Sequence, residues 1–344
     1  MRIKLAFIIL GIFFLLAVGA EFFAPCDYTA EQQDMPYQPP TRIHFFDTNG
    51  HFYLQPFVYQ YQIRQTAFHN RRYEEHSDVR YPVSLFVKTK QYLLWGVFPC
   101  SVRFCGVPAP AQLHLCGTDW RGRDLFARLL IGARITLSVA VLGGILTVGF
   151  GCLIGAASGY FAGWIDAVLM RCAEMCMMIP ALYVLLAVRS ALPPAIDSLT
   201  TFYLVIGILS LVGWPGCARI IRGQVLSLRE REFVQASRMI GKGHWHIITQ
   251  HILPHTTSYC IIAITACLPA YIVAESALSF LGLGIQEPYV SWGLLFKDAL
   301  SFTQLQFHPW LLWPGVCISL VVYSFTILGD ALRDMFDPQR ETGI

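Results

Sequence analysis

The chain has 344 residues, of which 55% are hydrophobic and only 14% charged, and its formal net charge is +3. Because an average soluble domain carries about 25% charged residues, this composition excludes an ordinary soluble domain and indicates an integral membrane protein. The net charge is too small to indicate nucleic-acid binding, and we expect none.

The first apolar segment covers about residues 5–20 and follows two cations. A cleaved signal peptide is one interpretation, because Val18-Gly19-Ala20 has the small residues of a cleavage site. Phe22 and Phe23 prolong the apolar run, which favours a retained transmembrane anchor over residues 1–24.

About 20 apolar residues span a bilayer as a helix, a structure in which one segment satisfies its own backbone hydrogen bonds. Five more segments qualify, at about residues 135–160, 165–188, 202–217, 259–284 and 310–328. With the anchor, they predict an all-α polytopic membrane protein with six transmembrane helices. Glycines in the second segment would let neighbouring helices approach closely.

Residues 25–130 are predicted to form a small β or α+β domain with a segment leading into the membrane core. Aromatic and branched residues flank Asn49-Gly50, which predicts a β-hairpin over residues 41–54. Residues 63–80 are polar and predict a loop or a short helix. Residues 81–87 predict a strand with Pro82 at its start or on an edge of the sheet.

Seven of the eleven cysteines lie in apolar segments, where cysteine acts as a small hydrophobe. The other four are Cys26, Cys100, Cys105 and Cys116. If residues 25–130 lie outside the cytoplasm, one or two disulfides are an open alternative to free thiols, and Cys100–Cys105 is the nearest pair in sequence.

The orientation follows from the positive charges, because short positive loops stay in the cytoplasm. The densest basic patch lies between the fourth and fifth segments and contains Arg219, Arg222, Arg229, Arg231, Arg238 and Lys242. This patch predicts that both termini are cytoplasmic and that residues 21 to about 130 are extracytoplasmic. Four arginines just before the second segment conflict with this prediction: Arg121, Arg123, Arg128 and Arg134.

Residues 235–254, within that basic loop, combine three features. An amphipathic helical turn leads to Met239 and Ile240, and Gly241 permits a backbone conformation that residues with a Cβ resist. Pro254 then marks the start of the next membrane helix. We predict a short helix lying across the membrane face and held at both ends by spanning helices, so that moving it must move them.

This loop resembles the EAA loop of ABC importer permeases, whose pattern is Glu-Ala-Ala, three residues, a glycine, and Leu-Pro at a fixed distance. The matching positions hold Gln235, Ala236, Ser237, Gly241, His251, Leu253 and Pro254. The ending His251 to Pro254 is similar to the dipeptide and oligopeptide (OppC/DppC-like) branch. Because Gln235 replaces the acid and Ser237 an alanine, docking on an ATPase is expected to rest on shape and apolar contact rather than on a salt bridge at Gln235.

Two further blocks resemble the same branch, residues 117–134 and residues 275–284 followed by 291–293, and the likeness covers about residues 117–340. The long loop after the first segment is similar to that of Yej-type permeases. The resemblance implies a type I ABC importer permease core over residues 131–334 and a cytoplasmic tail over residues 335–344.

By resemblance, the chain is a permease subunit of an ATP-driven importer of peptides or peptide-like solutes in the bacterial inner (plasma) membrane. The implied partners are a second homologous permease, two ATP-binding subunits, an extracytoplasmic solute-binding protein and membrane lipid. The chain contains no G-x-x-x-x-G-K-[ST] phosphate loop. We therefore expect a non-catalytic subunit that binds no cofactor, with ATP and Mg on the partner ATPase.

Charged residues inside membrane segments cost about 2.5 to 3.5 kcal/mol each on insertion scales and mark transport pathways by default. Arg171 and Glu174 are three residues apart, so they can neutralise each other on one helix face. We expect this pairing, with substrate contact as the alternative. We expect Glu275 to be structural or associated with a gate.

Other interpretations are weaker. Loop histidines at 244, 246, 251 and 255 suggest a metal site, but Pro254 disturbs the helix that would align the last two, and we expect no metal. A membrane thiol-redox or other enzyme would need a motif such as C-x-x-C or H-E-x-x-H, and neither occurs. A membrane anchor or sensor would need neither six spans nor this loop.

Overall fold

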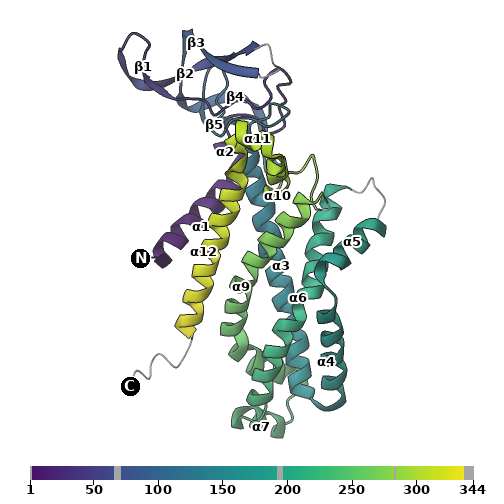
Figure 1. Cartoon of the computed structure of the whole chain (residues 1–344). Helices are drawn as coiled ribbons and strands as arrows, with labels where there is room; N and C mark the ends of the chain where they lie inside the picture. The colour runs from purple at the N-terminus through teal and green to yellow at the C-terminus, as the bar shows by residue number, and fades with distance from the viewer. Residues whose placement is uncertain (1, 66–70, 192–196, 283, 337–344) are drawn as a thin grey trace.

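Four long helices form the body of the molecule in the computed structural model, which describes residues 2–65, 71–191, 197–282 and 284–336. They are α3 (Leu125–Phe161), α6 (Ser198–Leu228), α9 (Leu253–Phe280) and α12 (Trp313–Phe336). In the described part of the chain, four helical stretches that contain most of these residues are long and apolar enough to cross a membrane. The protein is therefore predominantly helical, with a β-rich part at one end (Figure 1).

The first and third predicted spans each consist of two helices. The first is α1 (Arg2–Val18), followed after Gly19 by the single turn α2 (Ala20–Phe23). The third is divided into α4 (Gly163–Met178) and α5 (Ala181–Ala191). The division has a local cause, since Pro180 lacks an N–H and forces Ile179 into an extended conformation (φ −94°, ψ 115°). Six long helices are thus not found among the described residues, where four stretches are long and apolar enough to span.

Two antiparallel sheets lie between α2 and α3. One has the order β1-β2-β3, with β1 (His44–Phe46), β2 (Phe52–Gln65) and β3 (Arg71–Pro82). The other pairs β4 (Ser84–Leu94) with β5 (Phe98–Gly106). The predicted hairpin is confirmed, because β1 and β2 pair across a turn in which Gly50 has a φ of +81°.

The prediction of a loop or short helix over residues 63–80 is wrong, because the described part of this segment belongs to β2 and β3. Its polar side chains pair across the strands: Arg64 Nη1 lies 3.1 Å from Glu74 Oε2, and the Tyr61 hydroxyl donates to Glu75 Oε1 at 3.2 Å. Opposite-charge pairs stabilise a sheet, and charges protect an edge strand such as β3 from further pairing. Pro82 ends β3 on that edge.

Cys100 and Cys105 do not form a disulfide. Both lie on β5, and five residues of strand separate them by about 16 Å, which is too far for a disulfide. All eleven cysteines are free thiols in the described structure.

A stripe of three glycines on α3 lets this helix pack closely against α6. Gly151, Gly155 and Gly159 recur every fourth residue and so share one helix face. A Cβ at Gly155 would lie 2.5 Å from the carbonyl oxygen of Ala218 on α6. Gly149 differs, since a Cβ there would meet nothing within 4 Å. The predicted role of glycine in close helix packing is confirmed for this stripe, and Gly143 packs as closely against Tyr271 of α9.

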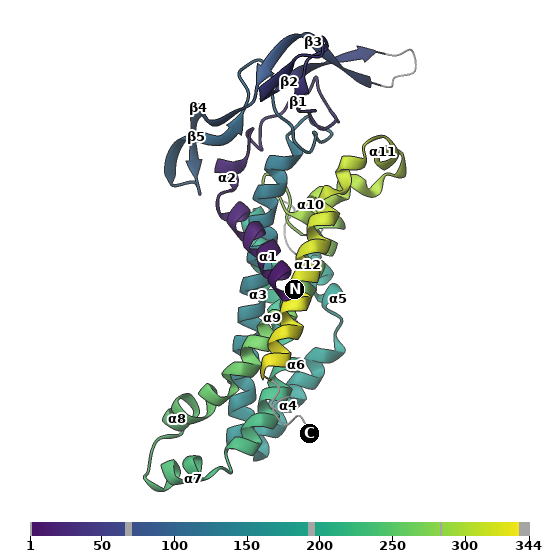
Figure 2. The ribbon, with the colours of Figure 1, turned by 90° about the vertical axis from the view of Figure 1, so that its left-hand side faces the viewer.

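The remaining elements lie at the two ends of the bundle. α7 (Glu232–Met239), α8 (His244–Ile247) and the π-helical turn η1 (Ile248–Ile252) lie at the end opposite the sheets (Figures 1 and 2). The other short elements, which precede α12, are α10 (Trp292–Phe296), η2 (Lys297–Leu300), α11 (Phe302–Phe307) and η3 (Pro309–Leu312). Most of the predicted tail, residues 337–344, lies outside the described residues.

Gly155→Ala should destabilise the protein, while Gly149→Ala should not. The new methyl group at position 155 has to push α6 away, and such overpacking typically costs about 1–3 kcal/mol. The measurement is the unfolding temperature of each variant in detergent. Equal unfolding temperatures for the two variants would show that the stripe does not determine the packing of α3 on α6.

Candidate coupling loop

The coupling loop, residues 235–254, begins inside α7, and Gly241 caps that helix. The Gly241 N–H donates to the carbonyl of Arg238 at 3.0 Å, and the Lys242 N–H donates to the carbonyl of Ser237 at 3.2 Å. This pair of bonds is the Schellman motif, whose first residue beyond the cap is left-handed. Gly241 has a φ of +78°. The glycine is therefore needed to end α7 and to reverse the chain towards α8.

One face of the loop is buried against the ends of α3 and α6. Val234, Ile247 and Ile252 are fully buried and Ile248 nearly so. They belong to one apolar cluster with Tyr160 of α3 and with Ile221 and Val225 of α6. The loop is consequently packed as part of the bundle and does not hang free below it.

Tyr160, at the end of α3, holds both halves of the loop. Its hydroxyl is 2.9 Å from Nδ1 of His244, and the guanidinium of Arg238 lies 4.6 Å from the centre of its ring. The sequence alone does not single out Tyr160, because a tyrosine at the end of an apolar segment also fits an ordinary interfacial anchor.

Asp166 and Arg222 form a second contact near this end of the bundle that sequence analysis missed. Arg222 on α6 donates from Nε and Nη2 to the two carboxylate oxygens of Asp166 on α4, each at 2.5 Å. Ser158 of α3 also donates to Asp166. Three helices are therefore tied together beside the loop, whereas the sequence placed Arg222 only in a basic patch.

The remaining predicted loop residues have separate places. Ser237 is buried on α7, and its hydroxyl lies 3.1 Å from Nε2 of His251. Gln235 is exposed, and its side-chain amide donates to the backbone carbonyl of Glu230 at 3.2 Å. Ala236 is exposed. Leu253 and Pro254 form the first turn of α9, directly after the π-helical turn, in which the Leu253 N–H bonds to the carbonyl of Ile248.

Three large apolar side chains of the loop are exposed. Met239 is 87% exposed, Ile240 76% and Trp245 68%. We call these three residues the docking face. Clustered apolar residues that remain exposed at the end of a molecule typically mark an interaction site.

The loop histidines contact other protein groups. Besides the contacts of His244 and His251, His246 Nε2 lies 3.2 Å from the Lys242 ammonium. The ring of His255 packs 5.2 Å from the ring of Phe233. In the described part of the chain, no three metal-ligating side chains gather in one place.

The charged residues of the apolar segments are placed differently from one another. The predicted pairing of Arg171 with Glu174 is confirmed, with Nη1 2.9 Å from Oε2, and both side chains are exposed on α4. Glu275 of α9 is buried, and its carboxylate accepts hydrogen bonds from Thr136 of α3 at 3.2 Å and from Ser279 at 2.7 Å. Glu275 thus links two helices through hydroxyl groups.

The four arginines that conflict with the predicted orientation are all paired with carboxylates. Arg121 pairs with Glu31 and Glu287, Arg123 and Arg128 with Asp119 and Glu287, and Arg134 with Glu21. Burial pushes the pKa of Glu287 upward, but the hydrogen bond from Arg123 and the nearby guanidinium charges hold it below its usual value. The positive charges of these four arginines are therefore balanced by neighbouring carboxylates.

Gly241→Ala should loosen the loop, whereas Gly243→Ala should leave it unchanged. A Cβ has open space at both positions, but only Gly241 has a positive φ, while Gly243 has a φ of −63°. The left-handed conformation costs a residue with a Cβ about 1–2 kcal/mol, which should raise the population of the opened loop roughly 5-fold or more. The measurement is the rate of trypsin cleavage after Arg238 and Lys242 in the folded protein, and equal rates would contradict the capping role.

Residues 151–342 match the family model described as "Binding-protein-dependent transport system inner membrane component". The chain is 41% identical over 231 residues to "Dipeptide transport system permease protein DppC" of Bacillus subtilis (strain 168), covering 67% of this chain and 70% of the relative. It is 37% identical over 233 residues to "Oligopeptide transport system permease protein OppC" of Haemophilus influenzae, covering 67% and 72%. A solved structure, "Inward facing conformations of the MetNI methionine ABC transporter: CY5 SeMet soak crystal form", aligns with 61% of this chain and 97% of that chain at 16% identity and a TM-score of 0.45, a likeness too weak to assign a fold. The chain therefore belongs to the inner membrane components of binding-protein-dependent transport systems, on the branch that contains the dipeptide and oligopeptide permeases.

Proposed function

We propose that this permease subunit forms half of the membrane pathway for peptides or peptide-like solutes, and that its coupling loop receives the work of a separate ATPase. The peptide class is inferred from the names of the relatives. The observation that carries the coupling role is the two-sided packing of the loop. One face is buried against α3 and α6, and the docking face is exposed.

The chemistry of the docking face favours an apolar protein partner. Met239 and Trp245 belong to the residue types enriched in the cores of protein interfaces. Gln235 carries no charge, and its amide donates to its own chain. Attachment to the ATPase therefore rests on shape and apolar burial, with no salt bridge at position 235.

Movement of the loop would pass to the membrane helices through contacts on both sides. Pressure on α7 and α8 reaches α3 through the contacts of Arg238 and His244 with Tyr160. It reaches α9 directly, because α8, the π-helical turn and α9 follow one another without a break. Rocking these helices as rigid bodies would switch the proposed membrane pathway between inward-facing and outward-facing states.

The proposed topology keeps six spans. α1 and α2 are nearly continuous, since the Phe23 N–H bonds back to the Gly19 carbonyl, and α4 with α5 forms a span broken at Pro180. The compensated arginines need not be held in the cytoplasm, so the sheet end is placed outside and both termini inside. Residues 25–130 are then extracytoplasmic.

The proposed assembly contains a second homologous permease, two ATP-binding subunits and an extracytoplasmic solute-binding protein. ATP and Mg would bind to the ATPase subunits, and this chain would contribute no catalytic group. The family description, a component of a binding-protein-dependent transport system, supports the solute-binding partner.

Met239→Ser should abolish ATP-dependent uptake and the co-purification of the ATPase while leaving membrane insertion intact. The reason is the loss of a large apolar contact from the docking face. Met335→Ser is a matched control, because Met335 is 78% exposed at the end of α12 and lies outside the loop. Co-purification in mild detergent and uptake into vesicles are measured for both variants. Normal ATPase recovery and uptake with Met239→Ser would overturn the docking assignment.

A further inference from the structure

The hairpin of β4 and β5 ends in an apolar tip, residues 93–98, at the outer end of the helical bundle. Leu93, Trp95, Val97 and Phe98 are all exposed there. In Figure 2 the hairpin descends beside α2 from the sheet towards the helices. At the tip, Trp95 Nε1 donates to the carbonyl of Val18, the last residue of α1, at 2.6 Å. Exposing four large apolar side chains of one turn to water is unfavourable, and such a patch typically marks an interaction site.

The tip lies beside the last charged residue before the apolar run of α3. Arg134 of α3 donates from Nε to the carbonyl of Ala17 at 3.0 Å, and its Nη2 lies 2.6 Å from Glu21. From Ile135 onward, α3 is apolar for about 26 residues. A charged pair directly before such a run marks the membrane boundary, and tryptophan is enriched at this level.

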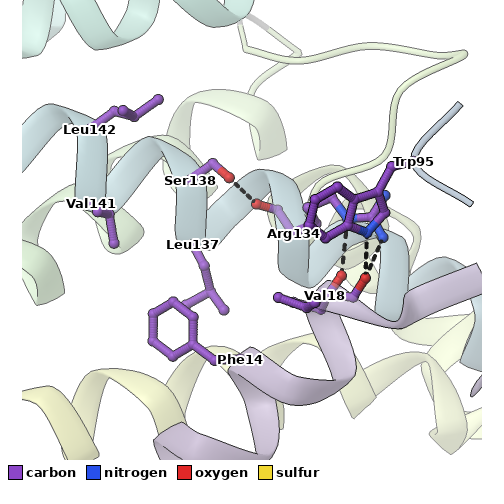
Figure 3. Close-up of a pocket in the computed structure, with 9 residues that line it drawn as sticks. Phe14, Val18, Trp95, Arg134, Leu137, Ser138, Val141 and Leu142 are labelled. Atoms are coloured by element: carbon purple, nitrogen blue, oxygen red, sulfur yellow. Dashed lines mark hydrogen bonds between the residues drawn. The ribbon is translucent and has the colours of Figure 1, made fainter. Parts of the chain in front are cut away.

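A groove runs from the tip along the surface between α1 and α3, with a volume of about 430 Å³. It is lined mainly by apolar side chains, including Phe14, Val18, Trp95, Leu137, Val141 and Leu142 (Figure 3). From position 134 to 142 it follows α3 for about 12 Å. The groove therefore runs from the membrane boundary into the apolar region.

The polar groups of the groove are already satisfied. The guanidinium of Arg134 is held by both oxygens of Glu21, and the Ser138 hydroxyl donates to the Arg134 carbonyl at 2.6 Å. No charge is left to select a polar ligand or an anionic headgroup. The ligand that fits is an unbranched apolar chain.

We propose that residues 93–98 insert into the bilayer leaflet on the sheet side and that the groove beneath Trp95 holds an acyl chain of a glycerophospholipid from that leaflet. Because Glu21 balances the charge of Arg134, the groove is expected to select lipids by their acyl chain and not by the charge of their headgroup. This assignment depends on the membrane location of the family and is independent of the coupling loop.

The first test uses tryptophan fluorescence of the complete transporter in phosphatidylcholine vesicles with brominated acyl chains. The Trp95 signal is the difference between the wild type and Trp95→Phe. It should lose most of its intensity to the brominated lipid and be insensitive to iodide in the water. Trp120→Phe gives the control signal, since Trp120 is also exposed near the sheets but stacks on Arg121, 4.4 Å from the ring centre. That signal should respond to iodide.

Two outcomes of this test would overturn the proposal. Quenching of the Trp95 signal by iodide would place the tip in water. Protection from both quenchers would show that another protein subunit covers the tip.

The second test concerns the groove itself. Val141→Trp fills the groove, whereas Ile145→Trp, one turn further along α3, replaces an exposed residue outside it. Native mass spectrometry of the complex in mild detergent should show one retained phospholipid fewer for Val141→Trp than for Ile145→Trp. Equal retention would refute the acyl-chain site.

Discussion

The close contact between α3 and α6 is the constraint on which the rest of the molecule depends. Helices in a lipid environment gain little from burying apolar surface against each other, so they associate through close van der Waals packing. The stripe of Gly151, Gly155 and Gly159 provides this packing, since each position lacks room for a Cβ. The end of the stripe is followed at once by Tyr160, which places the contact residue for the loop at a fixed distance from α6.

The coupling loop combines a rigid attachment with an open face. Its apolar cluster is continuous with the core formed by α3 and α6, so the loop cannot shift without disturbing those helices. Gly241 acts here as a helix cap in a defined left-handed conformation, which differs from a free hinge. A cap transmits movement better than a hinge, because the two short helices on either side keep a fixed mutual orientation.

The sequence predicted features that depend on neighbouring residues. The hairpin at Asn49-Gly50 and the pairing of Arg171 with Glu174 each follow from residues that lie close together in the chain, and both are present. The left-handed Gly241 also agrees with the expectation from sequence. In each of these patterns the interacting residues are close together in the sequence, so the feature can be predicted without the tertiary structure.

Features that depend on distant partners were not predicted. Asp166 and Arg222 are 56 residues apart, and neither residue type alone indicates the other. The strand β3 was not predicted, because its polar side chains find partners only when it lies beside β2, where Arg64 pairs with Glu74 and the Tyr61 hydroxyl donates to Glu75. The same holds for Arg121, Arg123 and Arg128, whose partner Glu287 lies far along the chain. A count of positive charges in the loops therefore gives these arginines too much weight when the membrane orientation is predicted.

The π-helical turn before α9 also sets a rotational register. A π-helical turn contains one more residue than the α-helical turn that it replaces, and each residue of a helix turns the chain by about 100°. With Ile248–Ile252 wound in this way, Met239, Ile240 and Trp245 are exposed, while α9 turns Tyr271 and Glu275 towards Thr147 and Thr136 of α3. The extra residue of the π-helical turn thus sets the direction in which the loop points. Deleting one residue here would rotate the exposed side chains about the helix axis, although their identities would stay the same.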